Sequence, residues 1–313
     1  MKKIIISFIV AYVSSAAFVT GTSNIILPFS QNGGPMSFGE FSLNGTLVRS
    51  LGTFPDGTRD VVQDASGNLQ AYTGTFTPAL MSQHNGSWTS QTFPGWSTVN
   101  SLDYGGIASI GNYVFVTDML TYNGGEQKGI IRFSTMGGSA VRFATSIEPI
   151  DLTTDGTHIW ALVNPREAQD NVAYEFDADT FALIKTVPIP GFDTRSISVA
   201  SNGDIYSADW HGVINHLNSD GTLIKSISFD NGKFSDINLS ANGDIALARG
   251  FGGGIYYTDT NLVSLTQFQA QDGVTFPTEF TAFSVEPVPE PTSVALACIG
   301  AIVLCGTQKA RRP

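Results

Sequence analysis

The sequence predicts an all-β fold on three observations. Only 14% of the 313 residues are charged, while Gly (33 residues) and Phe (21 residues) are abundant. A helical protein would contain more Ala, Glu, Lys and Leu. Short apolar runs alternate with turns that contain Gly, and the same turn-and-strand unit returns at a nearly constant spacing along the chain. These features favour many short strands joined by tight turns.

One turn recurs five times, each time just before an apolar strand. Its glycines are Gly67, Gly111, Gly156, Gly203 and Gly243, at intervals of 44, 45, 47 and 40 residues. A second turn recurs six times out of phase with the first, beginning at residues 44, 85, 137, 179, 220 and 260. Asn-Gly and Asp-Gly pairs in these turns favour tight hairpins. Two turns and about four strands per unit are typical of a β-propeller.

The unequal counts of the two turns predict how the ring closes. Residues 23–51 supply the later strands of a blade without its first strand, and residues 278–285 supply a first strand without the rest. Together they would form one blade from both ends of the chain, which leaves no free strand edge. Five whole blades and this shared blade predict a six-bladed β-propeller. An array of immunoglobulin-like sandwiches is the competing fold, and it does not explain complementary half-blades.

The strands themselves support the propeller. Residues 113–116 and 159–162 are continuously apolar, as expected for strands packed between neighbouring blades, and Trp160 is expected in the core. The segment NGDIYSADWHGVINHLNSDGTLIKSI at 202–227 resembles an NHL-type repeat, and the strands in general resemble those of NHL-type and gluconolactonase-like six-bladed propellers. This resemblance supports the fold far more than any particular activity, because propellers host many unrelated functions.

The first residues read as a secretory signal. Lys2 and Lys3 precede the apolar run Ile4–Val13, and small residues follow at positions 14–17. A permanent N-terminal anchor is the alternative, but the run is short for a span of roughly 20 residues. The predicted organisation is a signal peptide with a signal helix at 1–23, a β-propeller at 24–287 and a terminal segment at 288–313.

The terminal segment predicts a temporary membrane anchor. Its apolar run, Val294–Gly306, would form a single helix of ~20 Å, short of a hydrocarbon core of ~30 Å. Pro289 and Pro291 prevent this helix from continuing back into the domain. The basic residues that follow would keep this end on the cytoplasmic side of the membrane; they are Lys309, Arg311 and Arg312.

The order of these features resembles the PEP-CTERM sorting signal of Gram-negative bacteria. The motif residues are Val288, Pro289, Glu290 and Pro291, followed by the apolar run and the basic cluster. The resemblance implies that an exosortase in the cytoplasmic membrane recognises the motif, and that the protein reaches the cell surface or an exopolysaccharide matrix. A plain C-terminal membrane anchor is the alternative. The resemblance concerns sorting and implies nothing about the activity of the exported domain.

Charge and cysteine content exclude some function classes. Five of the 16 basic residues and one of the 27 acidic residues lie outside residues 24–287, which leaves 11 basic and 26 acidic residues and a formal charge of −15. Such a domain repels nucleic acid. The two cysteines, Cys298 and Cys305, both lie in the terminal segment, so no disulfide framework is expected in the domain.

Acidic residues stand where the innermost strands are expected to begin. They are Asp60, Asp103, Asp151 and Asp236. The fifth blade has Ser196 beside Arg195 at this point, and the shared blade has Glu279. Carboxylates that converge on one axis are the ligands that Ca²⁺ prefers. Gluconolactonase-like enzymes hold a divalent metal in the channel with a mixture of Glu, Asn and Asp that this sequence does not reproduce. Asp is also favoured in turns, so no cofactor is predicted beyond this candidate Ca²⁺ site.

Other chemistry has little support in the sequence. The four histidines, His84, His158, His211 and His216, lack zinc-motif spacing and are expected at the surface or at strand edges. No GxSxG elbow is present. Trp88, Trp96 and Trp210 are candidates for partly exposed side chains that stack on sugars, and packing between the blades is the more common alternative. The sequence therefore predicts an exported binding or structural protein of the cell surface or matrix, with a metal-dependent hydrolase of the lactonase type as the alternative.

Overall fold

The computed structural model describes most of the expected propeller. The described residues are 23–53, 55, 57–74, 78–96, 105–119, 127–164, 171–229, 232–250, 254–269, 274–276 and 280–284. The predicted signal helix, the predicted apolar helix and the PEP motif lie outside these residues. Residues 22–287 form a compact unit of their own. No helix that could cross a membrane occurs in the described part of the chain.

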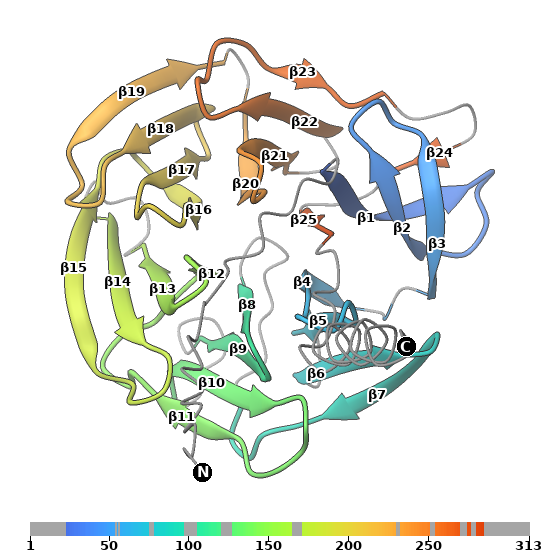
Figure 1. Ribbon diagram of the computed structural model, residues 1–313, viewed down its shortest axis with the longest axis horizontal. Coiled ribbons are helices and arrows are strands. Elements are labelled where there is room, and N and C mark those ends of the chain that lie inside the picture. Colours follow the sequence, from blue (N-terminus) through green and yellow to red (C-terminus); the bar gives the residue numbers. More distant parts are fainter. Residues whose placement is uncertain are drawn as a thin grey trace, which may run out of the picture. The chain divides into compact units, whose positions relative to one another are not determined.

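The described strands form six antiparallel sheets arranged as blades around a central axis (Figure 1). Five blades use consecutive strands, with the first strand innermost. Blade one has β4 (Thr58–Gln63), β5 (Leu69–Thr73), β6 (Ala79–His84) and β7 (Ser87–Gln91). Blade two has β8 (Ile107–Ile110), β9 (Tyr113–Asp118), β10 (Gly129–Ser134) and β11 (Val141–Phe143). Blade three has β12 (Asp151–Thr154), β13 (His158–Val163), β14 (Asn171–Asp177) and β15 (Leu183–Ile189).

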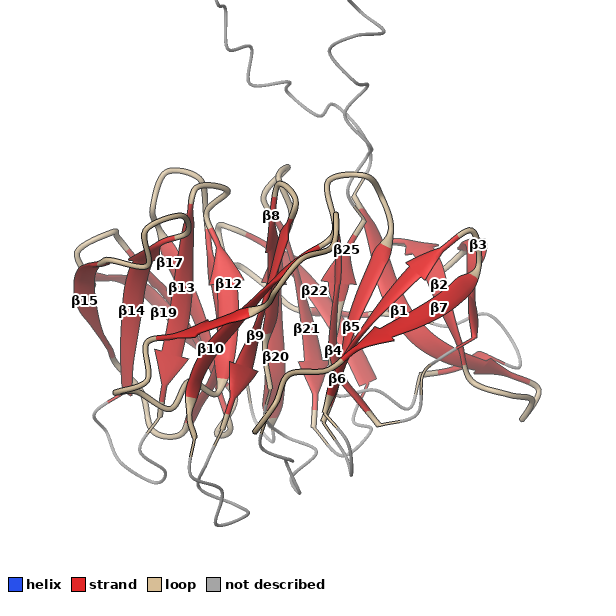
Figure 2. Ribbon diagram, turned by 90° about the horizontal axis from the view of Figure 1, so that it is seen from below, coloured by secondary structure: helices blue, strands red, loops and turns tan. Residues whose placement is uncertain are grey.

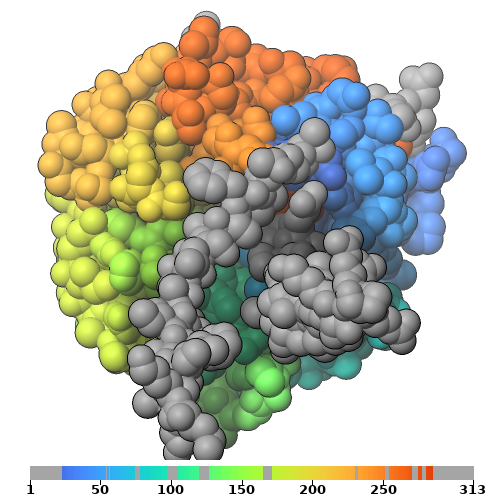
Figure 3. All heavy atoms as spheres, in the orientation of Figure 1, coloured from blue at the N-terminus to red at the C-terminus, as the bar shows by residue number. Residues whose placement is uncertain are grey.

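The remaining blades complete the ring. Blade four has β16 (Thr194–Val199), β17 (Ile205–Asp209), β18 (Val213–Leu217) and β19 (Leu223–Ser228). Blade five has β20 (Phe234–Leu239), β21 (Asp244–Arg249), β22 (Gly254–Asp259) and β23 (Thr266–Gln267). Blade six has β25 (Ala282–Phe283), β1 (Asn24–Gln31), β2 (Ser37–Ser42) and β3 (Leu47–Thr53), and β24 (Val274–Thr275) also pairs with β1. The coloured sectors in Figure 3 follow one another around the ring in chain order.

The prediction of a blade shared by both ends of the chain is confirmed. Strand β25 pairs with β1 through Ile26 opposite Ala282 and Ile25 opposite Phe283. The amide of Ser284 donates a hydrogen bond to the carbonyl of Asn24 at 2.9 Å. The two ends of the described chain therefore lie side by side, on the face of the propeller where the innermost strands end. We call this face the end face and the opposite one, where the innermost strands begin, the start face (Figure 2).

The tight turns follow the expected chemistry. In the β6–β7 hairpin, Asn85 and Gly86 adopt φ angles of 50° and 79° between the paired residues His84 and Ser87. Two consecutive positive φ angles are what a two-residue hairpin turn requires, and Asn-Gly adopts them at low cost. This turn sets β6 and β7 in register.

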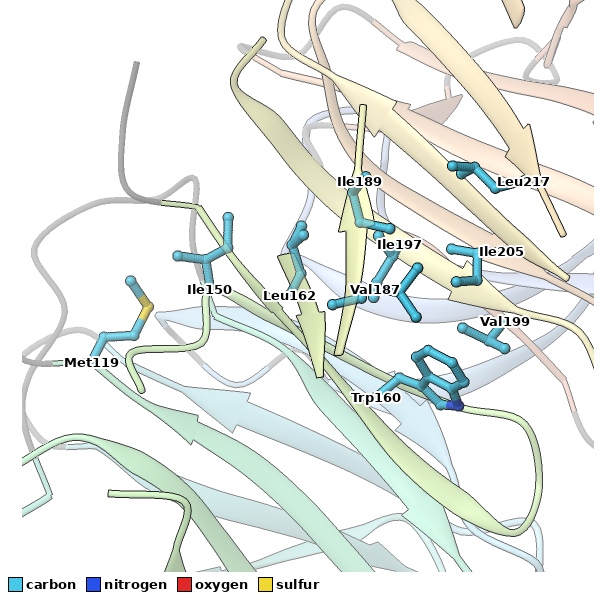
Figure 4. Packing of buried hydrophobic residues seen from close by; sticks show 11 residues of the cluster. Met119, Ile150, Trp160, Leu162, Val187, Ile189, Ile197, Val199, Ile205 and Leu217 are labelled. Carbon is cyan, nitrogen blue, oxygen red and sulfur yellow. The ribbon is translucent and has the colours of Figure 1, made fainter. Parts of the chain in front are cut away.

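The core lies between the blades, where side chains of neighbouring sheets interdigitate. Val114, Phe115 and Val116 on β9 are fully buried, as their continuous apolar run predicted. Figure 4 shows one cluster in which Trp160 and Leu162 of β13 and Val187 and Ile189 of β15 meet side chains of blade four. Those partners are Ile197, Val199, Ile205 and Leu217. Trp160 is 1% exposed, so the prediction that it belongs to the core is confirmed.

Basic side chains also connect neighbouring blades at their outer strands. Arg132 of blade two donates to the carbonyl of Ala178 in blade three at 3.3 Å. Lys185 of blade three donates to the carbonyl of Ser219 in blade four at 3.0 Å. Each contact holds an outer turn of the next blade and leaves little freedom between adjacent sheets.

Candidate functional site

The centre of the propeller is lined by one residue near the beginning of each innermost strand. Asp60 of β4 shows the pattern. Its Oδ1 accepts the backbone N–H of Val61 in its own strand at 2.7 Å. Its Oδ2 accepts the N–H of Ile107, in β8 of the next blade, at 3.1 Å. The carboxylate thus joins two adjacent innermost strands where no sheet hydrogen bonds connect them.

The two other described channel aspartates do the same. Asp151 accepts the N–H of Leu152 in its own strand and of Ile197 in β16 of the next blade, each at 2.8 Å. Asp236 accepts the N–H of Thr281, next to β25 in the shared blade, at 2.6 Å. The three aspartates come from blades one, three and five. In every second blade, a carboxylate therefore accepts a backbone N–H of the adjacent blade.

The intervening blades carry other residues at this position. The N–H groups that bind the aspartates belong to Ile107, Ile197 and Thr281, so the equivalent ring residues are those that precede them: Gly106, Ser196 and Phe280. A Cβ on Gly106 would lie 2.1 Å from the amide nitrogen of Leu152, so the close approach of β12 requires glycine there. Asp103 and Glu279 lie outside the described residues, and the ring positions of their blades belong to Gly106 and Phe280.

Ser196 connects two of the aspartates. Its Oγ lies 2.7 Å from Oδ2 of Asp151 and 3.0 Å from Oδ1 of Asp236, and it accepts the N–H of Ile237 at 3.1 Å. The serine hydroxyl has one proton for its two carboxylate contacts, so both contacts are full hydrogen bonds when Asp151 or Asp236 is protonated.

The electrostatics agree with this proton count. Burial, and then the nearby charge of Asp236, raises the pKa of Asp151 to about 7. Burial raises the pKa of Asp236 to about 6, although hydrogen bonds from Thr281 and Ser196 oppose the shift. Burial raises the pKa of Asp60 well above its usual value, and the charges of Asp236 and Asp151 add to this effect. Three carboxyl groups that influence one another in this way face a common axis.

Each ring carboxylate accepts hydrogen bonds from protein donors on both of its oxygens. Among the described residues, one group of three His, Cys, Asp or Glu side chains places a ligand atom of each within 4.8 Å of the others, and it consists of Asp155, His158 and Glu175. The channel aspartates do not form such a group. A calcium ion with oxygen ligands at 2.3–2.6 Å needs ligand atoms about that close. Binding of Ca²⁺ at the ring stays a prediction.

The aromatic candidates are placed differently from one another. Trp96 is 7% exposed and stacks on Tyr72, so it packs between blades, the alternative to sugar stacking. Trp88 is partly buried, and its Nε1 donates to the carbonyl of Thr53 at 2.8 Å. The Trp210 ring, also partly buried, lies under the guanidinium of Arg195 and the ammonium of Lys233. A sugar that stacked on Trp210 would have to displace one of these cations.

His84 and His211 are exposed, as expected, and His158 and His216 are partly buried within strands. His158 has partners that the sequence did not reveal. Nδ1 of His158 lies between two carboxylates, Asp155 and Glu175. Residue Glu175 is 17 positions away on a different strand, and only the pairing of β13 with β14 brings it near. The spacing Asp-x-x-His at 155–158 was the one available signal.

Comparison with known proteins supports the fold. No protein-family model matches the sequence, and no curated protein matches it. The structure is similar to a protein of unknown function from Bacteroides caccae, with a TM-score of 0.55 and 12% identity over 85% of this chain and 100% of that chain.

A gluconolactonase from Xanthomonas campestris has a TM-score of 0.51 and 15% identity over 73% of this chain and 84% of that chain. The Dos1 propeller has a TM-score of 0.51 and 12% identity over 79% of this chain and 71% of that chain. The fold is that of a six-bladed β-propeller. At these identities the similarity shows the fold alone.

Proposed function

We propose that this protein is an exported β-propeller of the bacterial cell surface or matrix that acts by binding or as a structural component. An exosortase would recognise Val288-Pro289-Glu290-Pro291 in the terminal segment and process it. The exported propeller would contact a neutral or basic partner such as exopolysaccharide, because a domain with a formal charge of −15 repels anions.

The main support for a non-enzymatic role is the hydrogen bonding of the channel aspartates to adjacent blades. Each one accepts backbone N–H groups that hold adjacent blades together. Catalytic carboxylates need free acceptor positions for a metal, a water molecule or a substrate. Carboxylates that already bind the backbone of two strands stabilise the contacts between adjacent blades.

The positions of the chain ends support the sorting part of the proposal. Asn24 and Ser284 lie together on the end face, and Ser23 contacts Ser240 there at 3.0 Å. The two ends of the described propeller therefore lie on one face. The start face carries neither chain end, and we assign partner binding to it.

The sorting proposal is tested in a bacterium that contains an exosortase. The full chain and a variant with Pro289, Glu290 and Pro291 all replaced by Ala are expressed, and their size and location are compared. The variant should accumulate as an unprocessed, membrane-retained form. Met136→Ala, at a propeller residue that is 79% exposed, serves as the control and should be processed normally. Normal release of the triple variant would contradict the proposal.

A second candidate function is hydrolysis of a lactone at the channel. Similarity to the Xanthomonas campestris gluconolactonase and the three buried ring carboxyl groups favour it. The test is an assay of the purified protein against a panel of lactones with and without Ca²⁺, Mg²⁺ or Zn²⁺. Turnover that Asp60→Asn abolishes would support a lactonase, whereas no turnover with any ion would leave the binding or structural role.

A further inference from the structure

A mixed cluster of one imidazole and two carboxylates lies on blade three, away from the channel. Asp155 belongs to the turn between β12 and β13, His158 begins β13 and Glu175 lies on β14. Nδ1 of His158 is 3.2 Å from Oδ2 of Asp155 and 3.0 Å from Oε1 of Glu175. The imidazole is about one-third exposed, while the carboxylates are nearly buried, so the cluster opens to solvent on one side.

The second oxygen of each carboxylate is held by other groups. Oδ1 of Asp155 accepts the N–H groups of Thr157 and His158, each at 2.8 Å. Oε2 of Glu175 lies 3.2 Å from Nζ of Lys185, which also holds the next blade. Each carboxylate therefore presents its remaining oxygen toward the same imidazole nitrogen. Outer partners of this kind orient metal ligands in proteins.

The composition of the cluster suits a cation. The Asp155 carboxylate is held in place by the N–H groups of Thr157 and His158. Trp160 adds a hydrogen bond from Nε1 to Oδ2 at 3.2 Å. Two carboxylates and one lysine ammonium surround the imidazole, so carboxylates outnumber the ammonium beside them.

Two of the three separations between ligand atoms are close to the geometry of zinc, and all three atoms lie within 4.8 Å of one another. With bonds of about 2.0–2.1 Å to nitrogen and oxygen, two ligands of a tetrahedral Zn²⁺ lie roughly 3.3 Å apart. The separations of 3.0 and 3.2 Å are close to this value. One N–H of a protonated imidazole would have to divide between two carboxylates, whereas a cation can bind both oxygens and the nitrogen at once.

The repeat supplies an internal comparison in blade four. The register places Asp204 at the position of His158, Tyr206 at that of Trp160 and His216 at that of Glu175. There Nε2 of His216 forms an ion pair with Asp204 at 3.1 Å. Asp155 is replaced by Ala200 in this register. Blade four therefore has two side chains that could bind a metal at the positions where blade three has three such side chains.

We propose that Asp155, His158 and Glu175 bind one Zn²⁺ ion on the side of blade three, with solvent as the fourth ligand. The bound ion would fasten the β12–β13 turn to β14. The site is independent of the channel residues and of the proposed sorting.

The test is a Zn²⁺ titration of the full chain by isothermal calorimetry at pH 7.5, after removal of metal with EDTA. His158→Ala should lose one equivalent of Zn²⁺ that the unchanged protein binds. Glu175→Gln keeps the shape of the side chain and should weaken this equivalent at least tenfold. His216→Ala is the matched control and should retain it. Cys298 and Cys305 are common to all variants, so their contribution cancels in the comparison.

Folding of each variant is checked by its unfolding midpoint without zinc. Were His158→Ala to fold poorly, Glu175→Gln would decide the matter, because it changes one charge at constant volume. Equal zinc binding by the unchanged protein, His158→Ala and Glu175→Gln would overturn the proposal. Equal loss in His216→Ala and His158→Ala would also overturn it, because the effect would not be specific to blade three.

Discussion

The hydroxyl of Ser196 lies 2.7 Å from Oδ2 of Asp151, and the same oxygen also reaches Asp236. The serine therefore links blade three to blade five across the blade between them. Since it has one proton for two carboxyl contacts, both contacts are full hydrogen bonds when one aspartate is protonated. We expect such a proton to stabilise the channel together with the backbone hydrogen bonds.

Replacing Ser196 with Ala should destabilise the protein by about 1–3 kcal/mol, because two buried carboxyl groups and the N–H of Ile237 lose a partner. Chemical denaturation at pH 7 measures this effect. Ser207→Ala is the matched control: its hydroxyl is fully buried and has no hydrogen-bond partner, so its loss should be nearly neutral. Equal effects of the two substitutions would contradict the role of Ser196.

Stability should fall as the pH rises from about 5 to 8. Unfolded Asp titrates near ~3.9, whereas the pKa of Asp151 is raised to about 7 by burial and the charge of Asp236. Between these values the folded state binds more protons than the unfolded state, so raising the pH removes stability. Hydrogen bonds from Thr180 and Thr222 lower the pKa values of Asp177 and Asp220, respectively. These carboxyl groups are therefore already ionised in this pH range.

The measurement is the free energy of unfolding at several pH values for the unchanged protein and for Asp151→Asn. The loss between pH 5 and 8 should be on the order of 2 kcal/mol in the unchanged protein and clearly smaller in the variant. A pH dependence that is identical in the two proteins would show that Asp151 does not carry the proton.

Gly106→Ala should cost about 3 kcal/mol or more, because its Cβ would lie 2.1 Å from the amide nitrogen of Leu152 in the adjacent blade. Gly111→Asn is the control, since Gly111 has open space around it and a φ of 56° that Asn tolerates. Thermal unfolding compares the two variants. A Gly106→Ala protein as stable as the control would show that the blades can separate at this point without cost.

Closure of the ring makes a separate prediction at Phe280. This side chain is buried at the beginning of the closing segment, and its ring packs near Phe38 of β2 with centroids 6.5 Å apart. Phe280→Ala should cost about 3–5 kcal/mol. Phe192→Ala, at a side chain that is 39% exposed, should cost much less. Proteolysis that begins near residue 23 in the first variant, and not in the second, would localise the effect to the shared blade.

The fold could be predicted because the sequence shows both a repeated unit and an unequal number of the two kinds of turn. Recurrent Gly turns marked the blades, and the extra outer turn at 44–51 revealed the blade shared with residues 278–285. The candidate ring was predicted less well. Asp60, Asp151 and Asp236 were found, but their unequal distances from the turn glycines hid the fact that they are equivalent, because the β12–β13 turn places its glycine earlier.

The role of the ring residues depends on contacts between blades, which sequence spacing does not report. Each aspartate binds an N–H about 45 residues away, in the next blade. Aligning the blades on the first apolar residue of each inner strand, such as Ile107 or Ile197, would have identified Gly106 and Ser196 as ring positions. The His158 cluster was missed for the same reason, since Glu175 approaches only through strand pairing.

The central claim is our proposal that the channel carboxyl groups hold the blades together without a metal ion, against the alternative of the Ca²⁺ site that the sequence pattern suggested. The most direct test is the unfolding midpoint of the full chain at pH 7 with EDTA and then with Ca²⁺ added to millimolar concentration. The account predicts the same midpoint in both conditions. A ligand held at about 100 times its dissociation constant would add roughly 2.7 kcal/mol. A calcium-dependent rise that Asp151→Asn abolishes would contradict the account and favour the lactonase.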